Sequence, residues 1–399
     1  MVTPAVLHLE DDRIGYLSAA GTAGKVFSGK LKIISAAPSG RTLFAAMRES
    51  YTLAGFAWAA SGANGAYVSG PTAQAKYYRS QFDSKYKDPR GFPRPITNAG
   101  SQAACEATTG AGTFFWDTGT SKMYVHMWDG RLPDQADGWL WAESAYRFEI
   151  QQALSTNAGV ILLENLEFLS NTGTALNAGC RYRPQTTGAV NTAIYGVKGC
   201  LVYGTSSNGF ESYDGSITVF ENNHARYCHV DGLNYHSFVT TGTKGEFISV
   251  YEYDCSAFDM GWTGWADQAA LSNSANGSTS HDSLHTFRAN TVVGDCHGAP
   301  IADVNGVHSI NYNVQSSGPG STPTFNSCFW HDAYLGAGTT KKMYLWGCSG
   351  WDNGDTTVNV LDNTAQAAGA IGDIYVSYWR GQTNGAVIGT LKDFAGNTL

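Results

Sequence analysis

The stretch FENNHARYCHVDGLNYH (residues 220–236) opens the part of the chain that decides its fold. It contains a run of β-forming residues, an Asn–Asn step, a cysteine and, three residues later, an aspartate. A similar order recurs in VYEYDCSAFDMGW (250–262) and in FRANTVVGDCHGAPIADVNGVH (287–308), with GSTSHDSLH (277–285) between them. A pattern that returns every ~20–50 residues indicates a solenoid, in which each repeat is one coil of short strands.

Six cysteines mark the repeat over a longer part of the chain. They stand at positions 200, 228, 255, 296, 328 and 348, so consecutive cysteines are separated by 28, 27, 41, 32 and 20 residues. Loop insertions between coils explain the unequal separations. We therefore predict an all-β, right-handed parallel β-helix in which the cysteines form one inward-facing ladder of free thiols, because unpaired cysteine is among the most buried residue types. No pair has the C-x-x-C spacing of a zinc site, so no zinc is expected.

The composition of the chain agrees with a β-rich fold and bears on which classes of binding partner are expected. Charged residues make up 15% of the 399 residues, glycine occurs 47 times and aromatic residues reach 13%. This balance favours strands and tight turns over long helices. A net charge of −8 argues against a nucleic-acid partner, whereas aromatic and amide side chains with little charge suit neutral sugar rings.

The hydropathy of the chain bears on its localisation. The sequence has no apolar run of 18 residues, so neither a transmembrane helix nor a membrane partner is expected. The N-terminal MVTPAVLHLEDDR (1–13) lacks the basic and apolar regions of a signal peptide. We expect an extracellular or virion-associated protein, whose leader was removed or whose export follows another route, such as assembly into a virus particle.

The distribution of the repeats predicts three regions. Residues 1–110 show no repeat and are expected to cap or attach the coils, with a short hairpin at 24–35. Residues 111–137 contain FFWD and KMYVHMW on either side of a TGTS turn, which is the pattern of a β-hairpin. Residues 138–399 are expected to form the parallel β-helix.

A hairpin followed by β-coils with ENN steps, Asn and Cys ladders and DG corners resembles the pectate-lyase-like right-handed β-helix superfamily. The resemblance covers about residues 112–399. The superfamily includes polysaccharide lyases, polygalacturonase-type glycoside hydrolases, uronan epimerases and phage tailspike depolymerases. The resemblance implies a protein that acts on polysaccharides and, through the tailspikes, a possible homotrimer. It matches no diagnostic catalytic motif of one member, so no residue role is carried over.

Aspartates that follow the cysteines are the catalytic candidates. Asp231 stands three residues after Cys228 and Asp259 four residues after Cys255, so both would fall on one ridge of the helix. Carboxyl groups on neighbouring coils would lie about 5 Å apart, and those two coils apart about 10 Å, which suits the carboxyl pairs of glycosidases. The alternative is that these aspartates cap turns, because Asp tolerates a left-handed backbone. The candidate set is Asp231, Asp259 and Asp303, which stands seven residues after Cys296, together with Asp282 from the insertion at 263–285.

Histidines and tryptophans near these aspartates are the candidates for binding substrate. Eight of the ten histidines lie between His224 and His331. Histidine can act as an acid or a base near neutral pH, and tryptophan can stack on a sugar ring. The insertion at 263–285 is expected to be a loop on the binding face, although an ordinary polar surface loop is the alternative. The candidate set is His236, Trp262, Trp265, His281, Arg288 and His297.

These features predict a polysaccharide-degrading enzyme that hydrolyses glycosidic bonds with two carboxyl groups. The runner-up is a polysaccharide lyase or uronan epimerase, for which the acidic residues could bind Ca²⁺; hydrolysis requires no cofactor, and no metal site is assigned. The alternative from another class is a non-catalytic module that binds glycans or builds a virus particle or an adhesin. A polysaccharide is the expected partner in the first two hypotheses.

Overall fold

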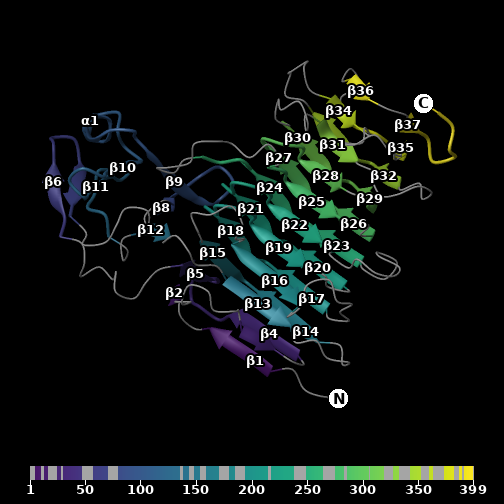
Figure 1. Ribbon diagram of the computed structural model, residues 1–399, viewed down its shortest axis with the longest axis horizontal. Coiled ribbons are helices and arrows are strands. Elements are labelled where there is room, and N and C mark those ends of the chain that lie inside the picture. The colour runs from purple at the N-terminus through teal and green to yellow at the C-terminus, as the bar shows by residue number, and fades with distance from the viewer. Residues whose placement is uncertain are drawn as a thin grey trace.

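Three parallel β-sheets wind around a common core in the computed structural model of the chain, and a separate sheet projects from their side (Figure 1). Each coil contributes one strand to each of the three sheets, as expected for a parallel β-helix. The prediction of an all-β parallel β-helix is confirmed. The structure describes residues 5–9, 13–16, 25–27, 30–46, 57–70, 80–134, 138–142, 148–152, 159–169, 179–184, 194–213, 217–237, 249–263, 275–282, 285–304, 306–318, 327–331, 342–351, 359–362, 373–381, 386–388 and 391–398.

We name the three sheets of the helix A, B and C, in the order in which most coils visit them. Sheet A contains β1 (Ala5–Leu9), β4 (Lys30–Ser35), β14 (Val160–Glu164), β17 (Ile194–Lys198), β20 (Ile217–Glu221), β23 (Ser249–Tyr253), β26 (His285–Ala289), β29 (His308–Tyr312), β32 (Lys342–Trp346), β35 (Asp373–Ser377) and β37 (Leu391–Lys392). Sheet B contains β2 (Arg13–Tyr16), β5 (Thr42–Ala46), β15 (Leu166–Leu169), β18 (Leu201–Tyr203), β21 (His224–Arg226), β24 (Ser256–Phe258), β27 (Val292–Gly294), β30 (Gln315–Ser317) and β33 (Ser349–Trp351). Sheet C contains β3 (Lys25–Phe27), β13 (Phe148–Gln152), β16 (Cys180–Pro184), β19 (Phe210–Tyr213), β22 (Leu233–His236), β25 (Ser278–His281), β28 (Ile301–Val304), β31 (Ser327–His331), β34 (Asn359–Asp362) and β36 (Ala386–Ile388).

Strand registers give the length of each coil. Ile194 pairs with Ile217, 23 residues later, and His285 pairs with His308 at the same interval. Between these coils the interval grows, because Ser249 lies 32 residues after its partner Ile217 and 36 residues before its partner His285. A coil of 23 residues with loop insertions therefore explains the irregular repeat in the sequence.

Side chains alternate between the core and the outside along the strands. In β20 the second and fourth residues, Thr218 and Phe220, are buried while the others are half-exposed. Successive side chains of a strand point to opposite faces, so one set from each sheet fills the interior of the coil. The resulting core runs without interruption from Ile33 to Ile374.

The corner between sheets A and B has one residue per coil in the left-handed region of φ. Asn222, Asp254 and Asn290 have φ of 54°, 52° and 55°. Asparagine and aspartate tolerate this backbone, and glycine replaces them on other coils. The Asn290 amide donates to Asp254 at 3.0 Å, and Asn313 donates to Asn290 at 2.8 Å, so the corner is an asparagine-rich ladder. The Asn step of the repeat therefore marks a turn.

The cysteines occupy several places in the coil, so the expected single ladder is wrong. Cys255 follows the left-handed residue at the corner between sheets A and B, whereas Cys228 follows Tyr227 at the end of a sheet B strand. Cys328 lies within β31 of sheet C. Spacing along the sequence could not separate these positions, because each is a small buried site. All eight cysteines are free and buried, which confirms the expected free thiols.

The helix begins earlier than predicted. β1 pairs with β4, and β4 pairs with β14, all in parallel, while β5 pairs with β15. Residues 5–46 therefore contribute the first coils, and the expected cap over residues 1–110 is wrong. The hairpin expected at 24–35 is also wrong, because β3 joins sheet C and β4 joins sheet A.

The segment between β5 and β13 forms the projecting sheet, which we call the inserted sheet (Figure 1). The predicted hairpin at 111–137 is present within it, because β10 and β11 pair antiparallel with Asp117 opposite Lys122. The hairpin is therefore one part of an insertion and not a leader to the coils. In addition to its strands the segment contains α1 (Gln102–Glu106), whose first turn is capped by the Ser101 hydroxyl. The strands are β6 (Ala59–Ser61), β7 (Ala66–Ser69), β8 (Ser80–Lys87), β9 (Pro93–Asn98), β10 (Thr113–Asp117), β11 (Lys122–His126) and β12 (Trp139–Ala142).

Candidate active site

The outer face of sheet C gathers polar side chains from several coils. Two outward-facing columns run across the strands, because alternate residues of paired strands stack on one face. The first column contains Arg181, Glu211, Asn234 and Thr279, and the second contains Arg183, Tyr213, His236 and His281. These eight side chains, with Asp231 and Asp282 beside them, are called the sheet C cluster.

Three rings of the second column form a continuous stack. The Tyr213 and His236 ring centroids are 4.9 Å apart, and those of His236 and His281 are 4.0 Å apart, with 9° between the planes in each pair. The Arg181 guanidinium lies 4.5 Å from the Tyr213 ring centroid. A cation over an aromatic face is favourable, so the arginine fixes one end of the stack.

His281 is held in its neutral form. Burial, and then the charge of His236, lower its pKa well below the usual value of 6.5. Its Nε2 is buried and accepts or donates no hydrogen bond among the residues that the structure describes. His281 therefore stays unprotonated at neutral pH, and it is a weaker base than an ordinary histidine because burial and His236 both oppose its charged form.

Asp282 lies at the end of β25, next to His236. One of its carboxylate oxygens is 3.7 Å from His236 Nδ1, and both side chains are about one-fifth exposed, at 20% and 17%. Its φ of 64° identifies it as a corner residue, as the turn-capping alternative requires. The corner places its carboxylate at the edge of the cluster, where solvent reaches it.

Asp231 lies deeper in the same cluster. Its carboxylate accepts the backbone N–H of Asn276 at 2.8 Å and the side-chain amide of Asn234. Burial raises its pKa from 3.8 to about 6, against the opposing effect of these hydrogen bonds. A carboxyl group that keeps its proton at mildly acidic pH has the property required of a general acid.

An ion-pair network closes the cluster on the side of β13. Arg181 Nε lies 3.0 Å from Glu211, whose carboxylate also accepts the Tyr213 hydroxyl at 2.5 Å and the Asn208 amide at 2.8 Å. Glu149 receives Arg183 Nε at 2.8 Å. The opposite end is apolar, because Trp330 packs there with Ala302. The sheet C cluster is therefore confined to about four coils, and half of its side chains are buried.

Asp303 and Arg288 are not part of the sheet C cluster, so their predicted roles at a substrate site are wrong. Both are fully buried and meet in the interior of the coil, with Arg288 Nη1 3.0 Å from Asp303. Arg288 also donates to Ser278 and Ser280, both at 2.9 Å. The alternation of strand residues points these side chains inward, where a polysaccharide cannot reach them.

Asp259 also lies outside the sheet C cluster. Its carboxylate receives Arg226 Nε at 2.5 Å and lies 4.0 Å from Arg90 of the inserted sheet. Arg226 pairs in addition with Asp88 of that sheet. Asp259 has a φ of 59° and is a corner residue that helps to join the inserted sheet to the coils.

The remaining predicted binding residues lie around the same junction or outside the description. Trp262 packs against Phe82 of the inserted sheet, with ring centroids 5.7 Å apart, which is a structural contact. The backbone N–H of His297 donates to Met260, so His297 lies in the turn that follows sheet B. Trp265, and the centre of the expected loop at 263–285, lie outside the described residues.

Four of the predicted residues are therefore brought together: Asp231, His236, His281 and Asp282. Sequence reasoning missed Tyr213, Glu211 and Arg181, because it searched only from residue 220 onward. Aligning RYR (181–183), ESY (211–213) and NYH (234–236) as successive sheet C strands would have found them, since these triplets follow one another at the same place in the coil.

Comparison with known proteins adds no family to this description: no family model matches the chain, and no curated protein matches its sequence. Among the described residues, no three His, Cys, Asp or Glu side chains are grouped so that they could hold a metal ion. In the same part of the chain, no helix has the length and apolar character needed to cross a membrane.

Proposed function

We propose that the chain is a polysaccharide-degrading enzyme of the pectate-lyase-like β-helix kind, and that it hydrolyses a glycosidic bond on the outer face of sheet C. The observation that carries this proposal is the contrast between two carboxyl groups on either side of His236. Asp231 is buried, with its pKa raised to about 6, while Asp282 is partly exposed beside the imidazole. When the surroundings of two carboxyl groups differ in this way, the buried group with the raised pKa is the candidate acid and the more exposed group is the candidate base.

The mechanism assigns each proton to a group. Asp231 donates its proton to the glycosidic oxygen as the bond from that oxygen to the anomeric carbon breaks. Asp282 removes a proton from water, whose oxygen attacks the anomeric carbon, and His236 holds the Asp282 carboxylate in place. Asp231 is buried beside the Asn234 amide, so the mechanism requires the bound sugar to displace that amide. Exchange with solvent then returns a proton to Asp231 and removes one from Asp282.

The mechanism proposed here inverts the anomeric carbon, because the attacking water is activated by Asp282 and no bond forms between the sugar and the protein. Carboxyl groups separated by ~6.5–9.5 Å leave room for a water molecule and give inverted products, whereas retaining enzymes need about 5–5.5 Å.

The test compares three matched Asp→Asn variants on a panel of neutral and acidic polysaccharides, with reducing ends as the readout. Asp231→Asn and Asp282→Asn are expected to lower the cleavage rate by ~10²–10⁴-fold. Asp259→Asn is the control, because it makes the same change at another left-handed corner and leaves the rate unchanged. Wild-type rates in both cluster variants would overturn the assignment. A wild-type protein that binds but cleaves no member of the panel would support a non-catalytic glycan-binding module instead.

Elimination from a uronan is the second candidate, and the neutral His281 favours it. The pKa of His281 lies well below 6.5, so its ring is unprotonated at neutral pH and has a nitrogen free to take the proton next to a uronate carboxylate, although as a weaker base than an ordinary histidine. Arg181 and Arg183 lie in the same cluster and could neutralise that carboxylate. Products that absorb ultraviolet light because they carry a new carbon–carbon double bond would establish elimination and exclude hydrolysis.

A further inference from the structure

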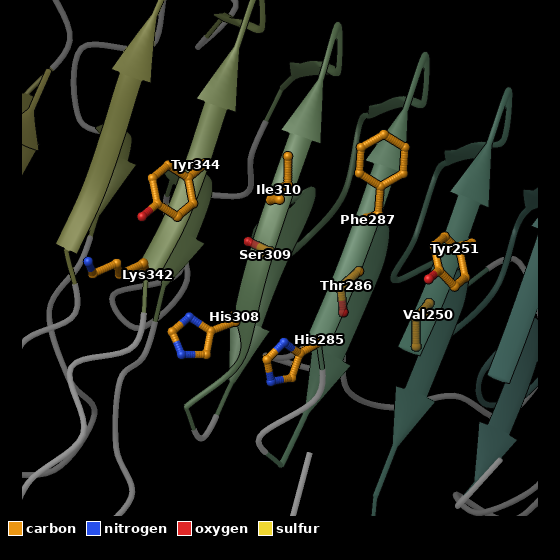
Figure 2. Close-up of a pocket in the computed structure, with 10 residues that line it drawn as sticks. All are labelled: Val250, Tyr251, His285, Thr286, Phe287, His308, Ser309, Ile310, Lys342 and Tyr344. Atoms are coloured by element: carbon orange, nitrogen blue, oxygen red, sulfur yellow. The ribbon is translucent and has the colours of Figure 1, made fainter. Parts of the chain in front are cut away.

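A groove of about 410 Å³ lies on the outer face of sheet A, which is a different sheet from that of the candidate active site. Figure 2 shows three nitrogen-bearing side chains along one end of the strands and a row of apolar side chains further along them. The outward-facing side chains come from four consecutive coils, β23, β26, β29 and β32. They are Tyr251, His285, Phe287, His308, Ile310, Lys342 and Tyr344.

The apolar row is in register across the coils. Tyr251 pairs with Phe287, Phe287 with Ile310, and Ile310 with Tyr344. The row therefore repeats every ~4.8 Å along the helix, which is close to the length of one sugar residue in a polysaccharide. Tyr251 and Ile310 are 36% and 49% exposed, so the row presents ring faces and aliphatic surface to solvent.

The row of nitrogen-bearing side chains runs parallel to it. His285 pairs with His308, and their ring centroids are 5.2 Å apart. Lys342 occupies the next coil, because Ser309 pairs with Met343. The next position, Asp373, is neutralised by Lys392 at 2.6 Å. Among the described residues, the row therefore offers imidazole donors and an ammonium group to an anion.

We propose that this groove binds a strand of acidic polysaccharide, with sugar rings over the apolar row and carboxylate or sulfate groups toward His285, His308 and Lys342. A flat apolar row suits the faces of sugar rings, and a row of donors repeating at the same interval suits one anionic group per residue. The inference rests on the proposed function, because it assumes that the protein acts on a glycan. It adds the acidic class of that glycan and a second place where it is held.

The binding test uses the Asp231→Asn chain, so that bound polymer is not degraded, and follows its retardation in native gels containing polymer. Polygalacturonate and alginate are the acidic probes, and dextran is the neutral one. We expect the acidic probes to retard the chain. Two groove variants, the double variant Lys342→Gln/His308→Gln and the single variant Phe287→Ala, should each weaken this retardation at least several-fold. Lys30→Gln is the matched control, because Lys30 occupies the strand position on β4 that Lys342 occupies on β32, seven coils away.

Two results would overturn the proposal that the groove binds acidic polysaccharide. One is equal retardation by dextran, and the other is unchanged retardation of the groove variants. Sedimentation of the wild type as an oligomer that Phe287→Ala dissociates would also overturn it, because the groove would then be an interface between copies. Polymer cleavage by the unmodified chain is measured in parallel. If acidic polymer retards the chain but the unmodified chain does not cleave it, the proposed function is contradicted and the groove is not. If the unmodified chain cleaves the polymer but the polymer causes no retardation, the groove is contradicted and the proposed function is not.

Discussion

The imidazoles of His236 and His281 stack face to face, with their centroids 4.0 Å apart on neighbouring coils of sheet C. Two imidazolium ions at this distance repel each other, and burial adds to the cost of charging His281. The stack therefore links the protonation of one ring to that of the other, at the place where the acidic candidates of the site also meet.

Titration of the histidines by NMR is expected to find His281 neutral at a pH well below 6.5. His236→Gln removes the second cause of this shift, so the pKa of His281 rises but stays below 6.5, because burial is the larger cause. The unfolded imidazole binds a proton below about pH 6.5 and the folded one does not, so this residue lowers stability as the pH falls through that range. A His281 resonance that titrates near pH 6.5 in the wild type would contradict the stack as described.

Asp231→Asn is expected to change how stability depends on pH. The pKa of the folded carboxyl, about 6, is above its unfolded value of 3.8, so wild-type stability falls as the pH rises between these values. Two units correspond to about 3 kcal/mol. Urea denaturation should therefore show that the free energy of unfolding of the variant rises by about that much relative to the wild type between pH 4 and pH 6.5. If the difference in free energy of unfolding between the two proteins stayed constant over this pH range, Asp231 would be ionised throughout it.

Arg288→Met is expected to destabilise the helix by about 3–5 kcal/mol, because it leaves the buried carboxylates of Asp303 and Glu252 without their cation. The measurement is the urea midpoint followed by circular dichroism. Lys198→Met is the control, since it breaks an exposed pair with Glu221 on the same sheet and should barely move the midpoint. A small effect of both variants would show that solvent reaches the interior pair.

The cysteines are expected to resist alkylation in the native protein. Burial raises the pKa of the Cys200 and Cys228 thiols to about 12, so almost no thiolate forms at pH 8. Mass spectrometry after iodoacetamide should show an unmodified chain in buffer and eight additions in denaturant. Because all eight thiols are free, a reducing agent should leave the melting temperature unchanged. A lower melting temperature in reductant would reveal a disulfide.

Much of the fold could be predicted from the sequence because its signals are local. Alternating residues such as those of β20 and the Asn steps at Asn222 and Asn290 each specify a strand or a corner on their own. The candidate site was only partly predictable. His236 and Asp282 lie 46 residues apart in the chain, and only the pairing of β22 with β25 brings them together.

The sequence by itself determined that the chain winds into parallel coils with buried free thiols, because strand alternation and turn chemistry are properties of neighbouring residues. Only the tertiary structure decided which aspartate faces the solvent and which the core. A cysteine can fill several small interior positions, so counting from it does not establish the face of the next aspartate. Asp303 consequently lies inside the coil with Arg288, while Asp231 belongs to the sheet C cluster, although both follow a cysteine of the repeat.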